Sequence, residues 1–470
     1  MPSPVAHSRE DLLMKKRYTA ALATLGLAFA GFAVPTLAGT AQAGQDEAIE
    51  AGYDQFIVTF ADSAKSRGLA HKGVTQVREL ESGSVVVKPS RGLGRNGTAA
   101  LINDLRKQAG VVSVEPDLIM TATAVPTDTR YSEQWDLFEP TAGMNAPGAW
   151  TTADGAGVTV AVIDTGIVKH SDLDGNVLPG YDFISDATSA RDGNGRDANP
   201  NDEGDWYAAG ECGGAANPSN SSWHGSHVAG TIAAVSDNAN GITGIAAKAK
   251  IVPVRVLGKC GGRTSDIADA ITWASGGRVR GVPANANPAK VLNLSLGGSG
   301  SCARAYQRAI DGAVSRGTTV VIAAGNSNSN VSGFTPANCN NVVSVAASDR
   351  EGNRAWYSNY GSLIDVAAPG GEVRNETDPS GSRTKPQDGI LSTINAGATV
   401  QTTEDYKTFM GTSMAAPHVA GLVALMLGEK PLTPAQVEAA LKANVRPLPG
   451  VCAEGCGAGL IDATKTIANI

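Results

Sequence analysis

The feature that most constrains the fold is an alternation of short, continuously apolar segments with helical ones from residue 145 onward. Five segments indicate fully buried strands: GVTVAVI, AKIVPVRVL, AKVLNLSL, TTVVIAA and NVVSVAA. Helical stretches are HVAGTIAAV, TSDIADAITWA and CARAYQRAIDGAVSRG. Buried strands alternating with helices are typical of a parallel sheet covered on both faces. The sequence therefore predicts an α/β fold with a doubly wound parallel sheet, whose functional sites gather at the carboxyl ends of the strands.

The N-terminal segment indicates export. Basic residues from Lys15 to Arg17 precede an apolar run that closes with Ala41-Gln42-Ala43, the small-x-small pattern of signal peptidase sites. Glycine and proline interrupt the run, which is also short, so no membrane anchor is expected. We predict a signal peptide over residues 1–43, cleaved after Ala43. Met14 is the expected start, because the acidic residues before it fit the basic beginning of such a peptide poorly.

Charge and cysteine content exclude two classes of partner. The formal net charge is −7, and no Lys/Arg cluster follows residue 20, which argues against a nucleic-acid partner. The six cysteines include no Cys-x-x-Cys pair, so their spacing does not indicate zinc. An even number of cysteines in an exported chain predicts disulfides. They are Cys212, Cys260, Cys302, Cys339, Cys452 and Cys456.

A cysteine-free module occupies residues 53–120. DQFIVTF, GSVVVKPS and VVSVEPDLIM indicate strands, and TAALINDLRKQAG indicates a helix, as in a small α+β sandwich of the split β-α-β kind. The following stretch, TATAVPTDTRYSEQWDL, consists largely of small and polar residues and is a plausible protease-accessible linker. We therefore predict one domain over residues 44–122 and another over 123–470.

Four chemistry-bearing side chains occupy strand ends or helix starts. Asp164 ends the first apolar run, His224 opens a helix, Asn326 follows TTVVIAAG, and Ser413 precedes the helix of GTSMAAPHVAG. Each alone has an ordinary interpretation as a turn or cap residue. Together they supply an acid, a base, an amide donor and a nucleophile, the groups that an activated serine needs. A metal pair of His224 with His227 is the alternative, although it lacks the His-Glu-x-x-His pattern.

At these residues the sequence resembles the subtilisin-like serine proteases. VIDTGI, HGSHVAGTIAA, NLSLGG, AAGN and GTSMAAPHVAG occur in that family's order over roughly residues 130–465, with Ser226 where threonine is more usual. The resemblance implies a triad of Asp164, His224 and Ser413, and an oxyanion hole made by Asn326 and the Ser413 backbone N–H. It implies a secreted, monomeric serine endopeptidase acting on proteins and peptides.

The resemblance also gives the N-terminal module a role. It looks like the family's inhibitory propeptide, so a self-processing zymogen is expected, with a retained accessory domain as the alternative. A catalytically silent binding protein on the same scaffold is the alternative from another functional class.

Two glycine-containing segments, KCGGRTS and SLGG, resemble the strands that clamp an extended substrate in this family. Ordinary glycine turns are the alternative. The residues that the resemblance assigns to substrate binding are Gly261, Gly262, Ser295, Leu296, Gly297, Gly298, Ala324, Gly325 and Phe334. Five of them, Gly297, Gly298, Ala324, Gly325 and Phe334, are expected to line the primary specificity pocket.

Two oxygen-rich loops suggest structural calcium. VSDNANGITG resembles the family's calcium loop, and a polar insertion over residues 182–222 could hold further ions or be merely solvated. The ligands expected around the first loop are Asp172, Asn238 and the carbonyls of Ser236, Asn240 and Ile242. Those expected in the insertion are Asp192, Asn194, Asp197, Asp202 and Asp205.

Six cysteines allow 15 pairings, so counting alone does not choose among them. The expected positions near the substrate-binding segments favour sequential pairing: Cys212–Cys260, Cys302–Cys339 and Cys452–Cys456.

Overall fold

The computed structural model describes residues 55–61, 71–90, 95–117, 125–378 and 382–470. The chain divides into two compact units, Met1–Thr121 and Ala122–Ile470, which are described separately. The predicted signal peptide lies outside the described residues. Within the described part of the chain, no helix is long and apolar enough to cross a membrane.

The smaller unit is a four-stranded antiparallel sheet with one described helix, α2 (Arg95–Arg106). The helix begins earlier than the predicted stretch. Phe56 and Val58 of the sheet pack against Leu101, Ile102 and Leu105 of α2. This is the small α+β fold that the sequence predicts. The strands, in the spatial order β2-β3-β1-β4, are β1 (Phe56–Phe60), β2 (Val74–Glu79), β3 (Val85–Pro89) and β4 (Val111–Pro116).

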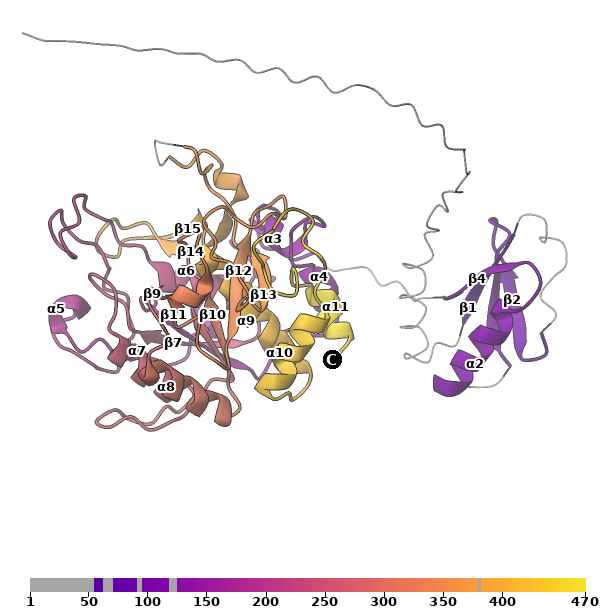
Figure 1. The fold of residues 1–470 in the computed structure, drawn as a ribbon, viewed down its shortest axis with the longest axis horizontal. Coiled ribbons are helices and arrows are strands. Elements are labelled where there is room, and N and C mark those ends of the chain that lie inside the picture. The colour runs from indigo at the N-terminus through magenta and orange to yellow at the C-terminus, as the bar shows by residue number, and fades with distance from the viewer. Residues whose placement is uncertain (1–54, 62–70, 91–94, 118–124, 379–381) are drawn as a thin grey trace, which may run out of the picture. The chain divides into compact units, whose positions relative to one another are not determined.

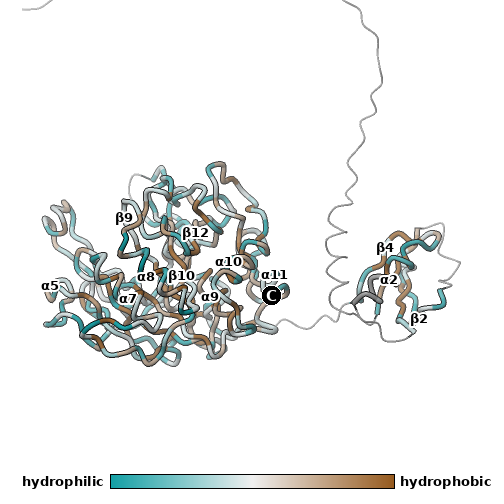
Figure 2. Tube along the Cα trace, turned by 60° about the horizontal axis from the view of Figure 1, so that its bottom comes forward, coloured by the Kyte–Doolittle hydropathy of each residue, from teal (hydrophilic) through white to brown (hydrophobic). Residues whose placement is uncertain are grey.

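The larger unit is built on a seven-stranded sheet in which every recorded strand pair is parallel (Figure 1). The spatial order is β13-β12-β10-β8-β5-β7-β6. The central strands carry valine, isoleucine and alanine, the hydrophobic positions coloured brown in Figure 2. The strands are β5 (Thr159–Asp164), β6 (Tyr181–Asp182), β7 (Lys250–Arg255), β8 (Val291–Leu294), β10 (Thr319–Ala323), β12 (Val343–Ser348) and β13 (Val366–Pro369).

Helices cover both faces of this sheet, so the predicted doubly wound fold is confirmed. Alternate residues of β5 show the two sides: Val160 and Val162 belong to one core, whereas Ala161 and Ile163 belong to the other. The first core includes residues of α6 (His224–Ala233), α9 (Thr412–Glu429) and α10 (Pro434–Ala443). The second includes residues of α7 (Thr264–Ala274) and α8 (Arg304–Ser315).

Two short antiparallel ribbons lie outside the main sheet. One pairs β9 (Gly298–Ser299) with β11 (Phe334–Thr335), and the other pairs β14 (Ile390–Asn395) with β15 (Glu404–Phe409). The remaining short helices are η2 (Tyr131–Glu133), α3 (Trp135–Phe138), α4 (Ala146–Ala149), η3 (Asp174–Asn176), α5 (Ala187–Ala190), η4 (Val331–Gly333), η5 (Pro386–Asp388) and α11 (Ala463–Ala468).

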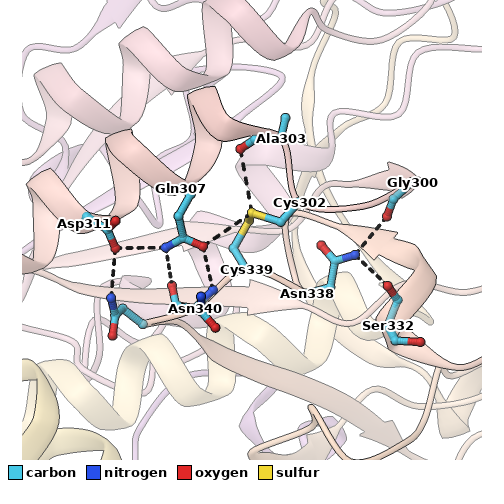
Figure 3. The surroundings of a disulfide bond; sticks show 10 residues. Gly300, Cys302, Ala303, Gln307, Asp311, Ser332, Asn338, Cys339 and Asn340 are labelled. Atoms are coloured by element: carbon cyan, nitrogen blue, oxygen red, sulfur yellow. Dashed lines mark hydrogen bonds between the residues drawn. A yellow bond between two sulfur atoms is a disulfide. The ribbon is translucent and has the colours of Figure 1, made fainter.

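Three disulfides connect loops of the larger unit in the sequential order that the sequence analysis predicts. Cys212–Cys260 joins the insertion to the segment after β7, and Cys302–Cys339 joins the regions after β9 and β11 (Figure 3). Cys452–Cys456 closes a small loop near the C-terminus. The first two bridges therefore hold segments that border the carboxyl edge of the sheet.

Candidate active site

The end of β5 and the start of α6 bring a carboxylate and an imidazole together. Asp164 is fully buried, and its Oδ1 lies 2.8 Å from Nδ1 of His224. The backbone N–H of Thr165 donates to the same oxygen at 2.7 Å. A Cβ on Gly225 would lie 2.2 Å from the carbonyl oxygen of Gly166, so glycine permits this close approach of helix and strand.

The electrostatics of this pair favour a protonatable imidazole. Burial lowers the pKa of His224, but the charge and hydrogen bond of Asp164, together with the charges of Asp205 and Asp202, outweigh burial and raise it above its ordinary value. An imidazole held by a carboxylate is both oriented and stabilised as a cation, which suits a general base.

Ser413 is the second residue of α9, a helix that packs against α6. Its hydroxyl donates to the carbonyl oxygen of Ser295 at 3.2 Å, while the Ser295 hydroxyl donates to the Ser413 carbonyl at 2.8 Å. The side chain therefore lies at a helix N-terminus, where free N–H groups and the helix dipole favour developing negative charge. It also touches the predicted substrate-binding segment.

Asn326 is fixed by a threonine that the sequence analysis missed. Its Oδ1 accepts hydrogen bonds from the backbone N–H and the hydroxyl of Thr412, both at 2.9 Å. The Thr412 hydroxyl in turn accepts from the Gly325 N–H at 3.0 Å. Because Oδ1 is the anchored atom, the Asn326 amide group remains as a donor. The only sequence signal for Thr412 is its place directly before Ser413.

A second carboxylate, from the insertion, braces the segments that carry Asp164 and His224. Asp202 accepts a hydrogen bond of 2.6 Å from the Thr165 hydroxyl, which accepts from the Gly225 N–H at 2.9 Å. Burial raises the pKa of Asp202 to about 7. Asp205 accepts from the Ser222 N–H at 2.6 Å and from its hydroxyl at 2.8 Å, two residues before His224. Both aspartates thus support the start of α6.

A cleft of about 710 Å³ runs beside these groups. Many of the predicted substrate-binding residues line it, but Ala324, Gly325 and Phe334 do not. The predicted residues in its wall are His224, Asp205, Cys212, Cys260, Gly261, Gly262, Ser295, Leu296, Gly297 and Gly298. Residues in its wall that sequence reasoning did not assign to substrate binding include Thr165, Tyr207, Leu257, Thr264, Ile267 and Tyr306.

The alternative metal pair does not form. His227 is fully buried, its Nε2 contacts the carbonyl oxygens of Ile390 and Lys407 at 3.0 and 2.9 Å, and its ring stacks on Phe409. Burial lowers the pKa of His227 to about 3, so the ring is neutral at neutral pH. It is a core residue of α6, not a ligand partner of His224.

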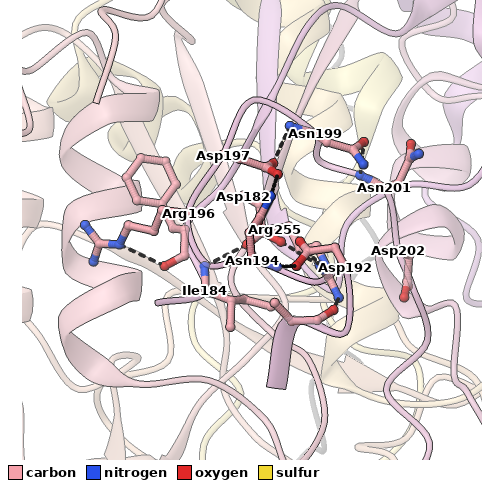
Figure 4. Close-up of polar contacts among 12 residues, drawn as sticks. Asp182, Ile184, Asp192, Asn194, Arg196, Asp197, Asn199, Asn201, Asp202 and Arg255 are labelled. Carbon is pink, nitrogen blue, oxygen red and sulfur yellow. Dashed lines mark hydrogen bonds and ion pairs between the residues drawn. The ribbon is translucent and has the colours of Figure 1, made fainter. Parts of the chain in front are cut away.

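The carboxylates of the insertion have separate protein partners (Figure 4). Buried Arg255 donates to Asp182 at 2.6 Å and to Asp192 at 3.4 Å. Asp197 accepts from the side-chain amide of Asn194 and the backbone N–H of Asn199. No three His, Cys, Asp or Glu residues gather into a possible metal site anywhere in the described ranges.

The 236–242 loop differs from the insertion, because the buried carboxylates of Asp128 and Asp172 both contact it. Asp172 accepts from Asn238, Ile242 and Tyr406, and Asp128 accepts from the N–H groups of Asp237 and Asn238. Burial is the main cause that raises the pKa of each, and the Asp172 charge raises that of Asp128 further. Within the described part of the chain, neither makes an ion pair with lysine or arginine.

Main-chain oxygens of the same loop are also available. None of the hydrogen bonds recorded among the described residues ends on the carbonyl oxygens predicted as ligands, those of Ser236, Asn240 and Ile242. Buried carboxylates beside unengaged carbonyls fit a hard divalent cation.

Comparison with known proteins gives a consistent result. The model of the Subtilase family matches residues 155–459. The "Extracellular protease" of Xanthomonas campestris pv. campestris is 56% identical over 397 residues, covering 84% of this chain and 66% of that protein. The "Extracellular basic protease" of Dichelobacter nodosus is 42% identical over 444 residues, covering 88% of this chain and 70% of that protein.

A solved structure is also similar. Its title begins "Proteases from Pseudoalteromonas arctica PAMC 21717". The TM-score is 0.70 and the sequence identity is 54%, and the match covers 73% of this chain and 99% of the solved one. These comparisons confirm the resemblance inferred from the motifs around Asp164, His224, Asn326 and Ser413.

Proposed function

Because the chain belongs to the subtilase family of serine proteases, we propose that it is a secreted endopeptidase with Asp164, His224 and Ser413 as its catalytic triad. The observation that carries this proposal is the contact of 2.8 Å between Asp164 and His224, at a sheet edge that α9 approaches with Ser413 at its start.

The geometry supports the following mechanism. Ser413 Oγ turns from the Ser295 carbonyl to His224, which takes its proton as Oγ attacks the peptide carbonyl carbon. Asp164 holds the Nδ1–H and stabilises the imidazolium. The Asn326 amide and the Ser413 N–H donate to the oxyanion. His224 then protonates the leaving amine, and after a water molecule enters, the same base activates it to hydrolyse the acyl-enzyme.

Substrate is held as an extended strand. We assign Gly261 and Gly262 to one side of the bound peptide and Ser295 to Gly298 to the other, because these segments line the cleft beside His224. Main-chain hydrogen bonds supply affinity in this mode, so substrates are unfolded or locally extended proteins.

The test is titration with an irreversible serine reagent such as a fluorophosphonate, followed by peptide mapping. We expect stoichiometric labelling of Ser413, with loss of peptide hydrolysis in proportion. The Ser413→Ala variant is the control and should not react. A folded protein that neither reacts nor cleaves would support the silent binding scaffold instead.

Asn326 provides a separate test of the mechanism. Replacing it with leucine should cut kcat by roughly 100- to 1,000-fold, the range for one lost oxyanion donor. KM should change little, because the donor acts mainly on the charged intermediate. An unchanged kcat would remove Asn326 from the mechanism.

The maturation pathway follows from the same triad. We assign residues 1–43 to a signal peptide and residues 44–122 to a propeptide that inhibits the enzyme until it is removed. The fold of the smaller unit and the names of the extracellular relatives support this assignment. Ser413→Ala should accumulate as a precursor that retains residues from 44 to about 122. Normal processing of that variant in a protease-deficient host would argue against self-cleavage.

Calcium is assigned to the 236–242 loop, with Asp172, Asn238 and the carbonyls of Ser236, Asn240 and Ile242 as ligands. Asp128 lies close enough to contribute its charge. The ion would neutralise the buried carboxylates and hold the loop against the N-terminal segment of the larger unit. Mature enzyme is expected to be a monomer.

A further inference from the structure

A buried histidine follows Ser413 along α9. His418 belongs to the segment GTSMAAPHVAG, and the proposed mechanism gives it no role. Its Nδ1 lies 2.7 Å from the carbonyl oxygen of Met414, and its Nε2 lies 2.9 Å from Oδ2 of Asp136 in α3. Both His418 and Asp136 are buried. The ring therefore connects the first turn of α9 to a residue 282 positions earlier in the chain.

The two contacts show how many protons the pair holds. A carbonyl oxygen only accepts hydrogen bonds, so Nδ1 of His418 carries a proton and donates to Met414. The contact with Asp136 needs a second proton, held either by Nε2 of an imidazolium or by the carboxylic acid. Within the described residues, no lysine or arginine forms an ion pair with Asp136. In both arrangements the pair as a whole is neutral, as burial without another cation requires.

The first turn of α9 depends on side-chain contacts because a proline follows it. Pro417 has no N–H, so the carbonyl oxygen of Ser413 lacks the donor that the residue four positions later normally supplies. That oxygen accepts from the Ser295 hydroxyl at 2.8 Å instead. The next carbonyl oxygen, that of Met414, accepts from the His418 ring. Side chains therefore bind two successive carbonyl oxygens at the nucleophile.

The segment that carries Asp136 is itself anchored. The two residues before Asp136 bind different parts of the larger unit. Gln134 exchanges two hydrogen bonds with the backbone of Thr243, at 2.8 and 2.9 Å. The indole N–H of Trp135 donates to the carbonyl oxygen of Gly389 at 3.1 Å. Asp136 therefore gives His418 a fixed contact outside α9.

We infer that His418 and Asp136 are positioning residues for Ser413. Their hydrogen bonds hold the first turn of α9, and this turn fixes Oγ and the backbone N–H of Ser413 relative to His224 and Asn326. Neither residue of the pair touches the reacting atoms, so the pair acts through the helix on turnover more than on peptide affinity. This inference rests on the proposed function.

Two replacements of Asp136 test the hydrogen bond. An asparagine amide can donate to Nε2 of a neutral His418, which keeps both ring contacts. No contact is lost at Oδ1 of Asp136, which has no hydrogen-bond partner in the described part of the chain. Leucine has a similar volume but no polar group. We expect Asp136→Asn to keep kcat within about threefold of the wild type, and Asp136→Leu to lower it by about 10- to 100-fold with little change in KM.

The double variant Asp136→Leu/His418→Leu removes the pair without leaving a buried charge, a replacement that proteins often tolerate. It should lose at least as much kcat as Asp136→Leu while remaining folded. kcat is expressed per active site, counted by fluorophosphonate titration. The rate of this labelling should fall in parallel, because the reagent needs the nucleophile and the oxyanion hole but no extended substrate. Variants that do not process themselves are cleaved by tagged wild-type enzyme, which is then removed.

Lys442→Met is the matched control, with Tm measured in the Ser413→Ala background. Lys442 lies on α10 and forms an ion pair with Asp365, so its loss should lower Tm without changing kcat or the labelling rate.

A normal kcat and labelling rate in either leucine variant, whatever its Tm, would show that the pair only stabilises the fold. That result would overturn the inference and leave the proposed function intact. An Asp136→Asn variant as slow as Asp136→Leu would overturn it as well, because asparagine keeps both hydrogen bonds. If the wild type neither labels at Ser413 nor cleaves peptides, the proposed function fails and this inference fails with it.

Discussion

Two oxygen-rich regions of the larger unit, the 236–242 loop and the 182–222 insertion, are similar in composition. Their buried carboxylates differ in whether a cationic side chain contacts them. In the 236–242 loop, Asp128 and Asp172 are buried near one another without a lysine or arginine partner in the described part of the chain. In the insertion, the carboxylates of Asp182 and Asp192 both contact Arg255, a fully buried residue at the end of β7. Asp202 and Asp205 accept hydrogen bonds from hydroxyls and backbone N–H groups, as Asp172 and Asp128 also do, so the arginine is what separates the two regions.

The difference shows that buried acidic residues in a loop do not by themselves indicate a metal site. A buried carboxylate needs compensation, and the source can be a metal ion, a cationic side chain or a set of hydrogen bonds. For the 236–242 loop, the source that we propose is the calcium ion. The insertion receives its cation from Arg255 at the end of β7. Its Asp202 and Asp205 brace Thr165 and Ser222 beside the candidate active site.

The largest effect should come from removing the internal cation. Arg255→Met leaves Asp182 and Asp192 buried without their partner and should lower the free energy of unfolding by about 3–5 kcal/mol. Chemical denaturation of the inactive Ser413→Ala background measures it without self-digestion. Lys248→Met is the control, since its ion pair with Asp154 is exposed to solvent and should contribute little to stability. Equal losses in the two variants would remove the distinction between the regions.

A smaller effect should follow from calcium. At a free concentration 100 times Kd, an ion bound only by the folded state stabilises it by about 2.7 kcal/mol. A chelator should therefore lower the Tm of the wild type, and Asp172→Asn should abolish most of this response. Asp197→Asn in the insertion should leave it unchanged. The reverse pattern, a response lost only in Asp197→Asn, would place the ion in the insertion.

The smallest effect concerns the acid limb of activity. Burial lowers the pKa of His224, but the charges of Asp164, Asp205 and Asp202 outweigh it and raise this pKa, and only the neutral imidazole can act as a base. Asp205→Asn removes one negative charge, so the pKa should fall and the acid limb of kcat/KM should move to lower pH. Asp197→Asn is the matched control in the same insertion. An acid limb that stays in place in Asp205→Asn would mean that Asp205 does not influence the base.

The sequence predicts more of the main sheet than of its surroundings. Strands such as Thr159–Asp164 and Thr319–Ala323 are buried on both faces, so their apolar runs are unambiguous. The β14–β15 ribbon was not predicted, because its outer strand, EDYKTF, is largely exposed and polar. Helix packing then places the ends of β5 and α6 together, as the strand-end rule predicts for Asp164 and His224.

By itself, the sequence determined the fold class and the family, because apolar periodicity and the motifs around Asp164, His224, Asn326 and Ser413 are local properties of the chain. Only the tertiary structure decided what compensates the buried charges and what orients the amide donor. Arg255 reaches Asp182 and Asp192, and Thr412 orients Asn326. These contacts join residues distant in the chain, and their energies depend on burial and distance, which no local pattern encodes.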